Sequence, residues 1–144
     1  MTKINPFLRL LLKSEGGITA ASDYAEDLQE AFEAGSERAY SNDPDDRGGA
    51  TFYGITTATF KRFWTDYHGT TPPPLRSLTF PDWQRIVARY YWEVLGCQHM
   101  QWQGVAMVAA DYGFNSGPAR AARALQVAVN QLLPDTHDAI RHID

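Results

Sequence analysis

The stretch NPFLRLLLKSEGG, residues 5–17, decides how the chain begins to fold. Its Asn-Pro start is typical of a helix N-terminus, because asparagine caps free backbone N–H groups and proline suits the first turn. Apolar residues then recur at helical spacing and predict one buried stripe: Phe7, Leu8, Leu11 and Leu12. Glu15 follows Leu11 by four residues, so it extends this stripe, and Gly16-Gly17 ends the helix. The sequence therefore predicts a carboxyl group at the end of an apolar face, where a charge is costly.

Residues 19–41 differ in character from this first helix. They are rich in Glu and Asp, and the helix expected over about 24–32 has only a thin apolar face. We therefore expect a solvated insertion or flap. The next segment, NDPDDRGGATFYGIT at 42–56, combines turn residues with β-formers and predicts a short hairpin of two or three strands.

The rest of the chain predicts helices. Thr57 is expected to cap one of them and Gly69 to end it, and Thr79 is expected to cap the next. Residues 104–112 are almost entirely apolar and predict a central helix. Residues 115–118 break this pattern. A last amphipathic helix opens at Pro118, and its inner face would be formed by Ala122, Leu125, Val129 and Leu132.

Length and composition predict one mainly α domain over residues 1–144, with a cleft between the hairpin lobe and the helices. The formal net charge of −4, without a basic stripe, argues against nucleic acid as a partner. No apolar run is long enough to span a bilayer. The single cysteine, Cys97, excludes an internal disulfide, and His99 is too near it for the usual cysteine-peptidase pair. The four histidines lack metal-ligand spacing, so we expect no metal and no cofactor.

Two kinds of carboxyl group in this chain fit the needs of glycoside hydrolysis, which requires a proton donor and a second, ionised carboxylate. Glu15 suits the donor, because an apolar setting and a helix C-terminus both favour a protonated carboxyl group. The second carboxylate would come from the hairpin segment, where the candidates are Asp43, Asp45 and Asp46, and Thr51 could position a water. Both assignments have an ordinary alternative: Glu15 could extend into solvent, and Asp-rich segments commonly form turns.

Several short motifs occur in a defined order along the chain. They are Glu15-Gly16-Gly17, Asp43-Pro44, Asp46 with Gly48-Gly49 and Thr51, Gly54-Ile55-Thr56, Tyr90-Tyr91-Trp92, Asp111-Tyr112 with Asn115-Ser116-Gly117, and Ala121-Ala122 with Leu125-Gln126. Each motif is weak alone. Together, over about residues 11–130, they resemble glycoside hydrolase family 108, a family of muramidases found in phage lysis cassettes and bacterial secretion systems.

This resemblance implies a lysozyme-like fold and cleavage of the β-1,4 bond between N-acetylmuramic acid and N-acetylglucosamine. By position in the motifs, the catalytic residues would be Glu15 as general acid, Asp46 and Thr51. Contacts with the glycan are expected from Asp43, Asp45, Tyr53, Tyr112 and Asn115. For the last two, a core aromatic residue and a helix cap are the ordinary alternatives.

The chain departs from the family pattern in two places. The interval between the EGG motif and the hairpin is long, which is why residues 19–41 are interpreted as an insertion and why the choice of second carboxylate stays open. The C-terminal wall-binding segment common in the family is not found. A lytic transglycosylase and a non-catalytic lysozyme-fold module that binds glycan or protein are the alternatives, and retention is not separated from inversion.

Location and partners follow from the same resemblance. Residues 1–17 carry no small-residue cleavage site, so we expect synthesis in the cytoplasm without a cleaved signal. Action in the periplasm or on the cell wall would then follow delivery by a holin or a secretion system, in phage lysis or as an antibacterial effector. Peptidoglycan is the expected partner, and the acidic insertion offers a surface for an immunity or delivery protein.

Overall fold

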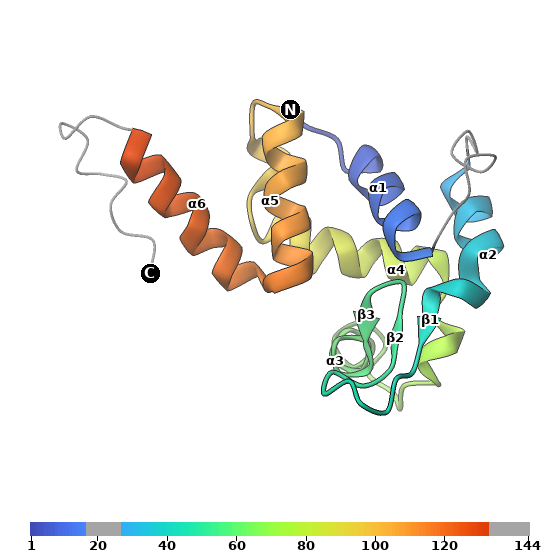
Figure 1. The fold of residues 1–144 in the computed structure, drawn as a ribbon. Helices are drawn as coiled ribbons and strands as arrows, with labels where there is room; N and C mark the ends of the chain where they lie inside the picture. The colour runs from blue at the N-terminus through green and yellow to red at the C-terminus, as the bar shows by residue number, and fades with distance from the viewer. Residues whose placement is uncertain (17–26, 133–144) are drawn as a thin grey trace. The chain divides into compact units, whose positions relative to one another are not determined.

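The computed structural model describes residues 1–16 and 27–132. These residues form six α-helices and a small three-stranded antiparallel sheet (Figure 1), which confirms the predicted mainly α class with one β element. The chain divides into two compact units. The first, called the hairpin unit below, comprises residues 8–86, and the second unit comprises residues 1–7 and the described residues from 87 onward.

The first helix, α1, spans Asn5–Gly16, as its sequence predicts. The predicted apolar stripe is confirmed, because its four members, Phe7, Leu8, Leu11 and Leu12, have no exposed surface. Lys13 and Ser14 are exposed on the other side of the helix. The last turn of α1 therefore has one face in the core and one in solvent.

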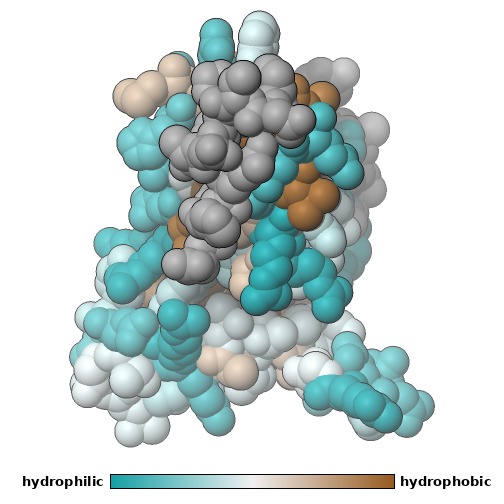
Figure 2. Space-filling view, turned by 90° about the vertical axis from the view of Figure 1, so that its left-hand side faces the viewer, coloured by the Kyte–Doolittle hydropathy of each residue, from teal (hydrophilic) through white to brown (hydrophobic). Residues whose placement is uncertain are grey.

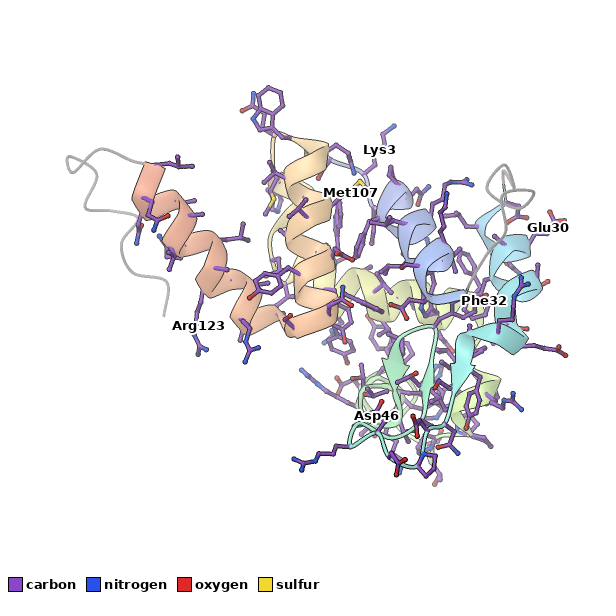
Figure 3. The ribbon with its side chains drawn as sticks, viewed as in Figure 1. Lys3, Glu30, Phe32, Asp46, Met107 and Arg123 are labelled. Carbon is purple, nitrogen blue, oxygen red and sulfur yellow. The ribbon has the colours of Figure 1, made fainter. Side chains whose placement is uncertain are left out.

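The second helix, α2, spans Leu28–Ala39 and begins at the Asp27 cap, whose carboxylate accepts a hydrogen bond from the Gln29 backbone N–H at 2.9 Å. Four small or aromatic residues of α2 are buried: Ala31, Phe32, Gly35 and Ala39. Phe32 lies among the rings of the core (Figure 3). The expectation of a solvated flap is therefore wrong for residues 28–39, because α2 contributes to the core. Residues 17–26 of the expected insertion lie outside the described residues.

The predicted hairpin is confirmed as a meander of three two-residue strands. These are β1 at Tyr40–Ser41, β2 at Thr51–Phe52 and β3 at Ile55–Thr56, in the order β1-β2-β3. Tyr40 pairs with Phe52, and Thr51 pairs with Thr56. The long connection between β1 and β2 carries the aspartates, and the tight connection between β2 and β3 consists of residues 53 and 54.

Two further helices complete the hairpin unit. Helix α3 spans Thr57–His68, with the Thr56 side chain as its cap and Gly69 at φ 65° ending it, so the predicted cap is displaced by one residue. A short 3-10 turn, η1, follows at Leu75–Ser77. Helix α4 spans Phe80–Val87 and begins after Thr79, as predicted. Phe60, Phe63, Trp83 and Ile86 bring the apolar sides of α3 and α4 into the core.

The second unit contains η2, a π-helical segment at Ala88–Glu93, the 3-10 turn η3 at Cys97–His99, and helices α5 and α6. The Cys97 side chain is fully buried, and its Sγ donates a hydrogen bond to the Ala106 carbonyl at 3.4 Å. Within the described ranges, no helix is both long enough and apolar enough to cross a membrane.

Helix α5 spans Gln103–Ser116 and ends at Gly117, within the predicted break at residues 115–118. Its expected central position is wrong. Only one face, formed by small residues such as Ala106 and Ala110, is buried, while Val108 is 72% exposed.

Helix α6 spans Pro118–Leu132, and its start at Pro118 is as predicted. Its expected inner face is not buried. Among the described residues of α6 only Ala121 is buried, and Leu132 is 84% exposed. Viewed from the side of α6, the surface accordingly shows hydrophobic side chains between hydrophilic ones (Figure 2).

Candidate active site

Glu15 lies in the last turn of α1, in the hairpin unit, and its side chain is half-buried. Leu11 and Leu12, one turn earlier on the same side, have no exposed surface, and Gly16 directly after it is buried. Glu15 is therefore at the border between core and solvent. A carboxyl group at such a border is partly desolvated and still accessible to a ligand, which a proton donor requires.

The three candidate aspartates lie together on the connection between β1 and β2, where Figure 3 labels Asp46. Asp43 accepts a hydrogen bond from the Asp45 backbone N–H at 3.0 Å, and Asp46 Oδ1 accepts one from the Gly48 N–H at 2.9 Å. All three are exposed. The turn-forming alternative is thus realised in the backbone, while all three side chains stay accessible to a ligand.

Thr51 opens β2 and is half-buried, paired across the sheet with Ser41 and Thr56. The sheet register fixes its backbone, so the direction of its side chain is set by the hairpin and not by a mobile loop. Thr51 and the three aspartates therefore belong to one hairpin, in the same unit as Glu15.

Tyr53 is placed differently from the expectation that it lines a glycan site. Its side chain is 0% exposed, and its hydroxyl donates a hydrogen bond to the Phe32 carbonyl at 2.6 Å. Burial raises the pKa of Tyr53 to about 12, against the lowering effect of the Arg38 charge. Tyr53 is a core residue in this structure, and a ligand at the surface does not reach it.

Tyr112 and Asn115 belong to α5, in the second unit. Asn115 is exposed and donates hydrogen bonds to the Asp111 carbonyl at 2.8 Å and to its carboxylate at 3.2 Å, so it closes its own helix turn. Tyr112 is 40% exposed. The expected cleft between the hairpin and these residues stays a prediction.

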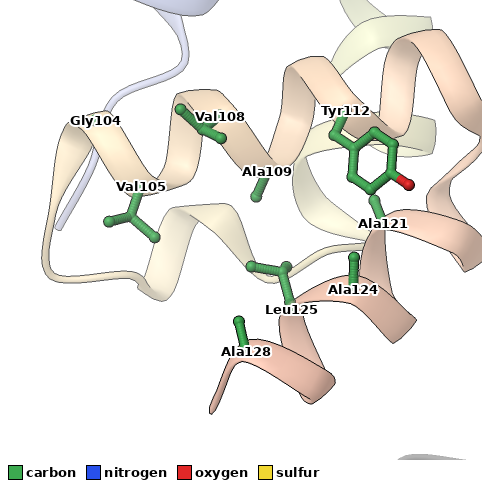
Figure 4. Close-up of a pocket in the computed structure, with 9 residues that line it drawn as sticks. All are labelled: Gly104, Val105, Val108, Ala109, Tyr112, Ala121, Ala124, Leu125 and Ala128. Carbon is green, nitrogen blue, oxygen red and sulfur yellow. The ribbon is translucent and has the colours of Figure 1, made fainter. Parts of the chain in front are cut away.

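Tyr112 also lines a groove of about 400 Å³ in the second unit (Figure 4). The other residues of the lining come from α5 and α6 and have no polar side-chain group: Gly104, Val105, Val108, Ala109, Ala121, Ala124, Leu125 and Ala128. A sugar chain needs several convergent hydrogen-bond partners, and this lining offers the Tyr112 hydroxyl alone. The groove is therefore not a candidate glycan site.

Among the side chains of residues 1–16 and 27–132, no group of three His, Cys, Asp or Glu is placed to hold an ion. The candidates for acid and base chemistry are the carboxyl groups of the hairpin unit described above. The sequence does not predict that two glycines pack against Tyr53, although both lie directly against its side chain: Gly16 and Gly35. The EGG motif was the available signal for the first, and the small-residue spacing in α2 for the second.

Comparison with known proteins places these features in a family context. The family model described as Glycosyl hydrolase 108 matches residues 31–117, a span that includes the hairpin, Asp46 and Thr51 and begins after Glu15. No curated protein matches the chain. A solved structure, described as the structure of Brucella abortus SagA, is similar with 30% sequence identity and a TM-score of 0.55, covering 76% of this chain. The chain spans 60% of the length of that protein.

Proposed function

Because this chain belongs to the glycosyl hydrolase 108 family, we propose that it hydrolyses the glycan strands of peptidoglycan, with Glu15 as the general acid. The bond proposed is the β-1,4 linkage between N-acetylmuramic acid and N-acetylglucosamine. The family match over most of the hairpin unit is the observation that carries this proposal. The similarity to Brucella abortus SagA agrees with it at the level of the fold.

The position of Glu15 supports its role as donor. It follows a helix face with no exposed surface, and the negative end of the α1 dipole lies at the same turn. A general acid must carry its proton before it reacts, and glycosidases place such a group next to apolar residues. The half-buried side chain can still reach a glycosidic oxygen at the surface.

Asp46 is proposed as the second carboxylate, with Thr51 orienting a water or the carboxylate itself. Asp46 is exposed, and its Oδ1 accepts one backbone hydrogen bond, so one oxygen is engaged in the turn and the other remains at the surface. A carboxylate that is accessible at the surface of the hairpin can contact the sugar that becomes positively charged in the reaction.

The decisive experiment incubates purified peptidoglycan with the wild-type chain and with Glu15→Gln, and identifies the released fragments by mass spectrometry. Hydrolysis gives muropeptides with a reducing end and one added water. The glutamine variant should lose about a hundredfold to ten-thousandfold in rate, because it cannot donate a proton, and it should keep its fold. Anhydro products would identify a lytic transglycosylase instead, and binding without products would identify a non-catalytic module.

A matched pair of variants tests Asp46. In Asp46→Asn the side-chain oxygen can still accept the Gly48 N–H while the charge is lost, and in Asp46→Ala both are lost. If the charge serves the reaction, the two variants lose activity to a similar extent. If Asp46 only forms the turn, the asparagine variant keeps the wild-type rate.

A further inference from the structure

Tyr53 has a backbone conformation that its residue type rarely adopts. Its φ is 47°, and Gly54 after it has a φ of 75°, so both residues of the tight connection between β2 and β3 have positive φ. Such two-residue turns strongly favour asparagine, aspartate or glycine at the first position, because a bulky side chain there is strained. Contacts of the Tyr53 side chain must therefore hold this conformation.

Every polar group of Tyr53 has a partner. Its N–H donates to the Ala39 carbonyl at 3.1 Å, its carbonyl accepts from Trp83 Nε1 at 3.2 Å, and its hydroxyl donates to the Phe32 carbonyl at 2.6 Å. Its ring stacks on the Phe32 ring with centroids 4.4 Å apart. The residue thus links the hairpin to α2 and α4 through three hydrogen bonds and a ring contact.

The same ring lies directly against the residue that follows Glu15. A Cβ atom placed on Gly16 would be 2.7 Å from Tyr53 Cε1, and one placed on Gly35 would overlap the Tyr53 hydroxyl oxygen. The Gly16 carbonyl oxygen is itself 3.5 Å from the Gly35 Cβ position. The glycines therefore let the end of α1 and the middle of α2 approach the Tyr53 side chain closely.

We propose that Tyr53 is a positioning residue for Glu15: its ring, fixed by the hairpin and α2, sets where the last turn of α1 lies. This inference rests on the proposed role of Glu15 as general acid. The carboxyl group is one residue away from the contact, so any shift of Gly16 on the ring is passed to Glu15 through a single peptide unit. The first glycine of the EGG motif would then serve the geometry of the donor by leaving room for Tyr53.

The test uses the full chain with Gly16→Ala, Tyr53→Phe and Phe63→Leu. The first adds a methyl group at the contact, and the second removes only the hydroxyl anchor. Phe63 is a fully buried residue of α3 and serves as a control that weakens the core elsewhere in the same unit. Denaturant unfolding first establishes that each variant is folded under the assay conditions. Initial rates are then measured on uncrosslinked peptidoglycan strands across a pH series.

For Gly16→Ala we expect kcat to fall about tenfold and KM to change less than about twofold, because a small misplacement of a catalytic group affects the reaction more than binding. The high-pH limb of the kcat profile should also shift, since this limb reports loss of the proton from the donor. Tyr53→Phe should also lower kcat, by about threefold, and should shift the high-pH limb of the kcat profile in the same direction. Phe63→Leu should keep the wild-type kcat and pH profile.

The outcomes separate the two proposals. If Glu15→Gln is as active as the wild type, the proposed function fails and the positioning role fails with it. If Glu15→Gln is inactive while folded Gly16→Ala and Tyr53→Phe keep the wild-type kcat and pH profile, the positioning role alone is overturned. If Gly16→Ala does not fold, Tyr53→Phe decides the question, because it removes the anchor of the ring to Phe32 without adding an atom at the contact with Gly16.

Discussion

The contact between Tyr53 and Gly35 predicts that two substitutions will be strongly non-additive. Replacing an interior helix glycine by alanine ordinarily stabilises a helix by about 1 kcal/mol. In α2, however, the added methyl group would overlap the Tyr53 hydroxyl oxygen. This oxygen cannot move aside, because the side chain is fully buried and bonded to the Phe32 carbonyl. Overpacking of this kind costs about 1–3 kcal/mol, so we expect Gly35→Ala to destabilise the chain.

Tyr53→Phe removes the atom that the methyl group would meet. The next atoms, Tyr53 Cζ and the Gly16 carbonyl oxygen, are 3.5 Å from the Cβ position, which is ordinary contact distance. In the phenylalanine background, Gly35→Ala should therefore be neutral or stabilising. Tyr53→Phe alone should cost about 1 kcal/mol for the lost hydrogen bond. We expect a coupling free energy of about 2 kcal/mol between the two sites.

The assay is urea unfolding of the wild type, both single variants and the double variant, followed by far-ultraviolet circular dichroism. Gly16→Ala is the matched control, because the atom nearest to its methyl group, Tyr53 Cε1 at 2.7 Å, is kept in phenylalanine, while the hydroxyl oxygen is a second contact at 3.2 Å. Most of its cost should therefore remain in the phenylalanine background. A coupling below about 0.5 kcal/mol for the Gly35 pair would refute the reasoning. Equal rescue of both glycine variants would refute it as well, since it would mean a general loosening of the core.

Two further predictions concern stability. Burial raises the pKa of Cys97 from 9.0 to about 11 and that of Tyr53 from 10.0 to about 12. As pH rises, the unfolded chain therefore loses these protons before the folded chain does. The free energy of unfolding, measured by urea titration, should fall by about 2–3 kcal/mol per group between about pH 9 and 12. In Tyr53→Phe, the share of this fall that Tyr53 contributes above about pH 10 should be missing. Phe32→Ala should cost about 3–5 kcal/mol in the same unfolding assay, whereas a solvated flap would tolerate it within about 0.5 kcal/mol.

The sequence predicts those elements whose ends are fixed by local chemistry. The Gly69 that ends α3 acts within one turn of chain, so it could be predicted, and the threonine cap of α3 was expected only one residue away, at Thr57 instead of Thr56. The same holds for Pro118 at the start of α6 and for the turn residues between β1 and β2. Local chemistry also explains why the stripe on α1 could be predicted: leucines at helical spacing have few other stable arrangements.

Features that depend on small residues were harder to predict. In α2, the buried face is formed by Ala31, Gly35 and Ala39 around the single large residue Phe32, so its apolar face looked thin. In α5, long apolar runs suggested a central helix, yet its close contacts are made by alanines and Val108 stays exposed. Small residues add little to an apolar pattern, but they decide how closely two helices can approach.

In the candidate site, too, features set by local sequence could be predicted and features set by tertiary contacts could not. The half-buried position of Glu15 could be predicted because this residue continues the apolar stripe of α1, and the turn at Asp46 because of its turn-forming neighbours, while their catalytic roles stay predictions. Tyr53 was expected at a ligand surface, since its sequence neighbours are hairpin residues and nothing in the chain indicates a partner 21 positions earlier at Phe32. The pairing of its ring with Gly16 is a tertiary contact between segments that the sequence leaves unconnected.

The enclosed thiol of Cys97 has a practical consequence. With a pKa of about 11, only about one thiol in ten thousand is ionised at neutral pH, and the thiolate is the form that alkylating reagents attack. Because this is the single cysteine of the chain and it has no exposed surface, a second cysteine introduced on the surface would carry a maleimide dye or spin label selectively. With two such cysteines on the hairpin unit, the distance between their labels could then be followed in solution while the native residue stays in place.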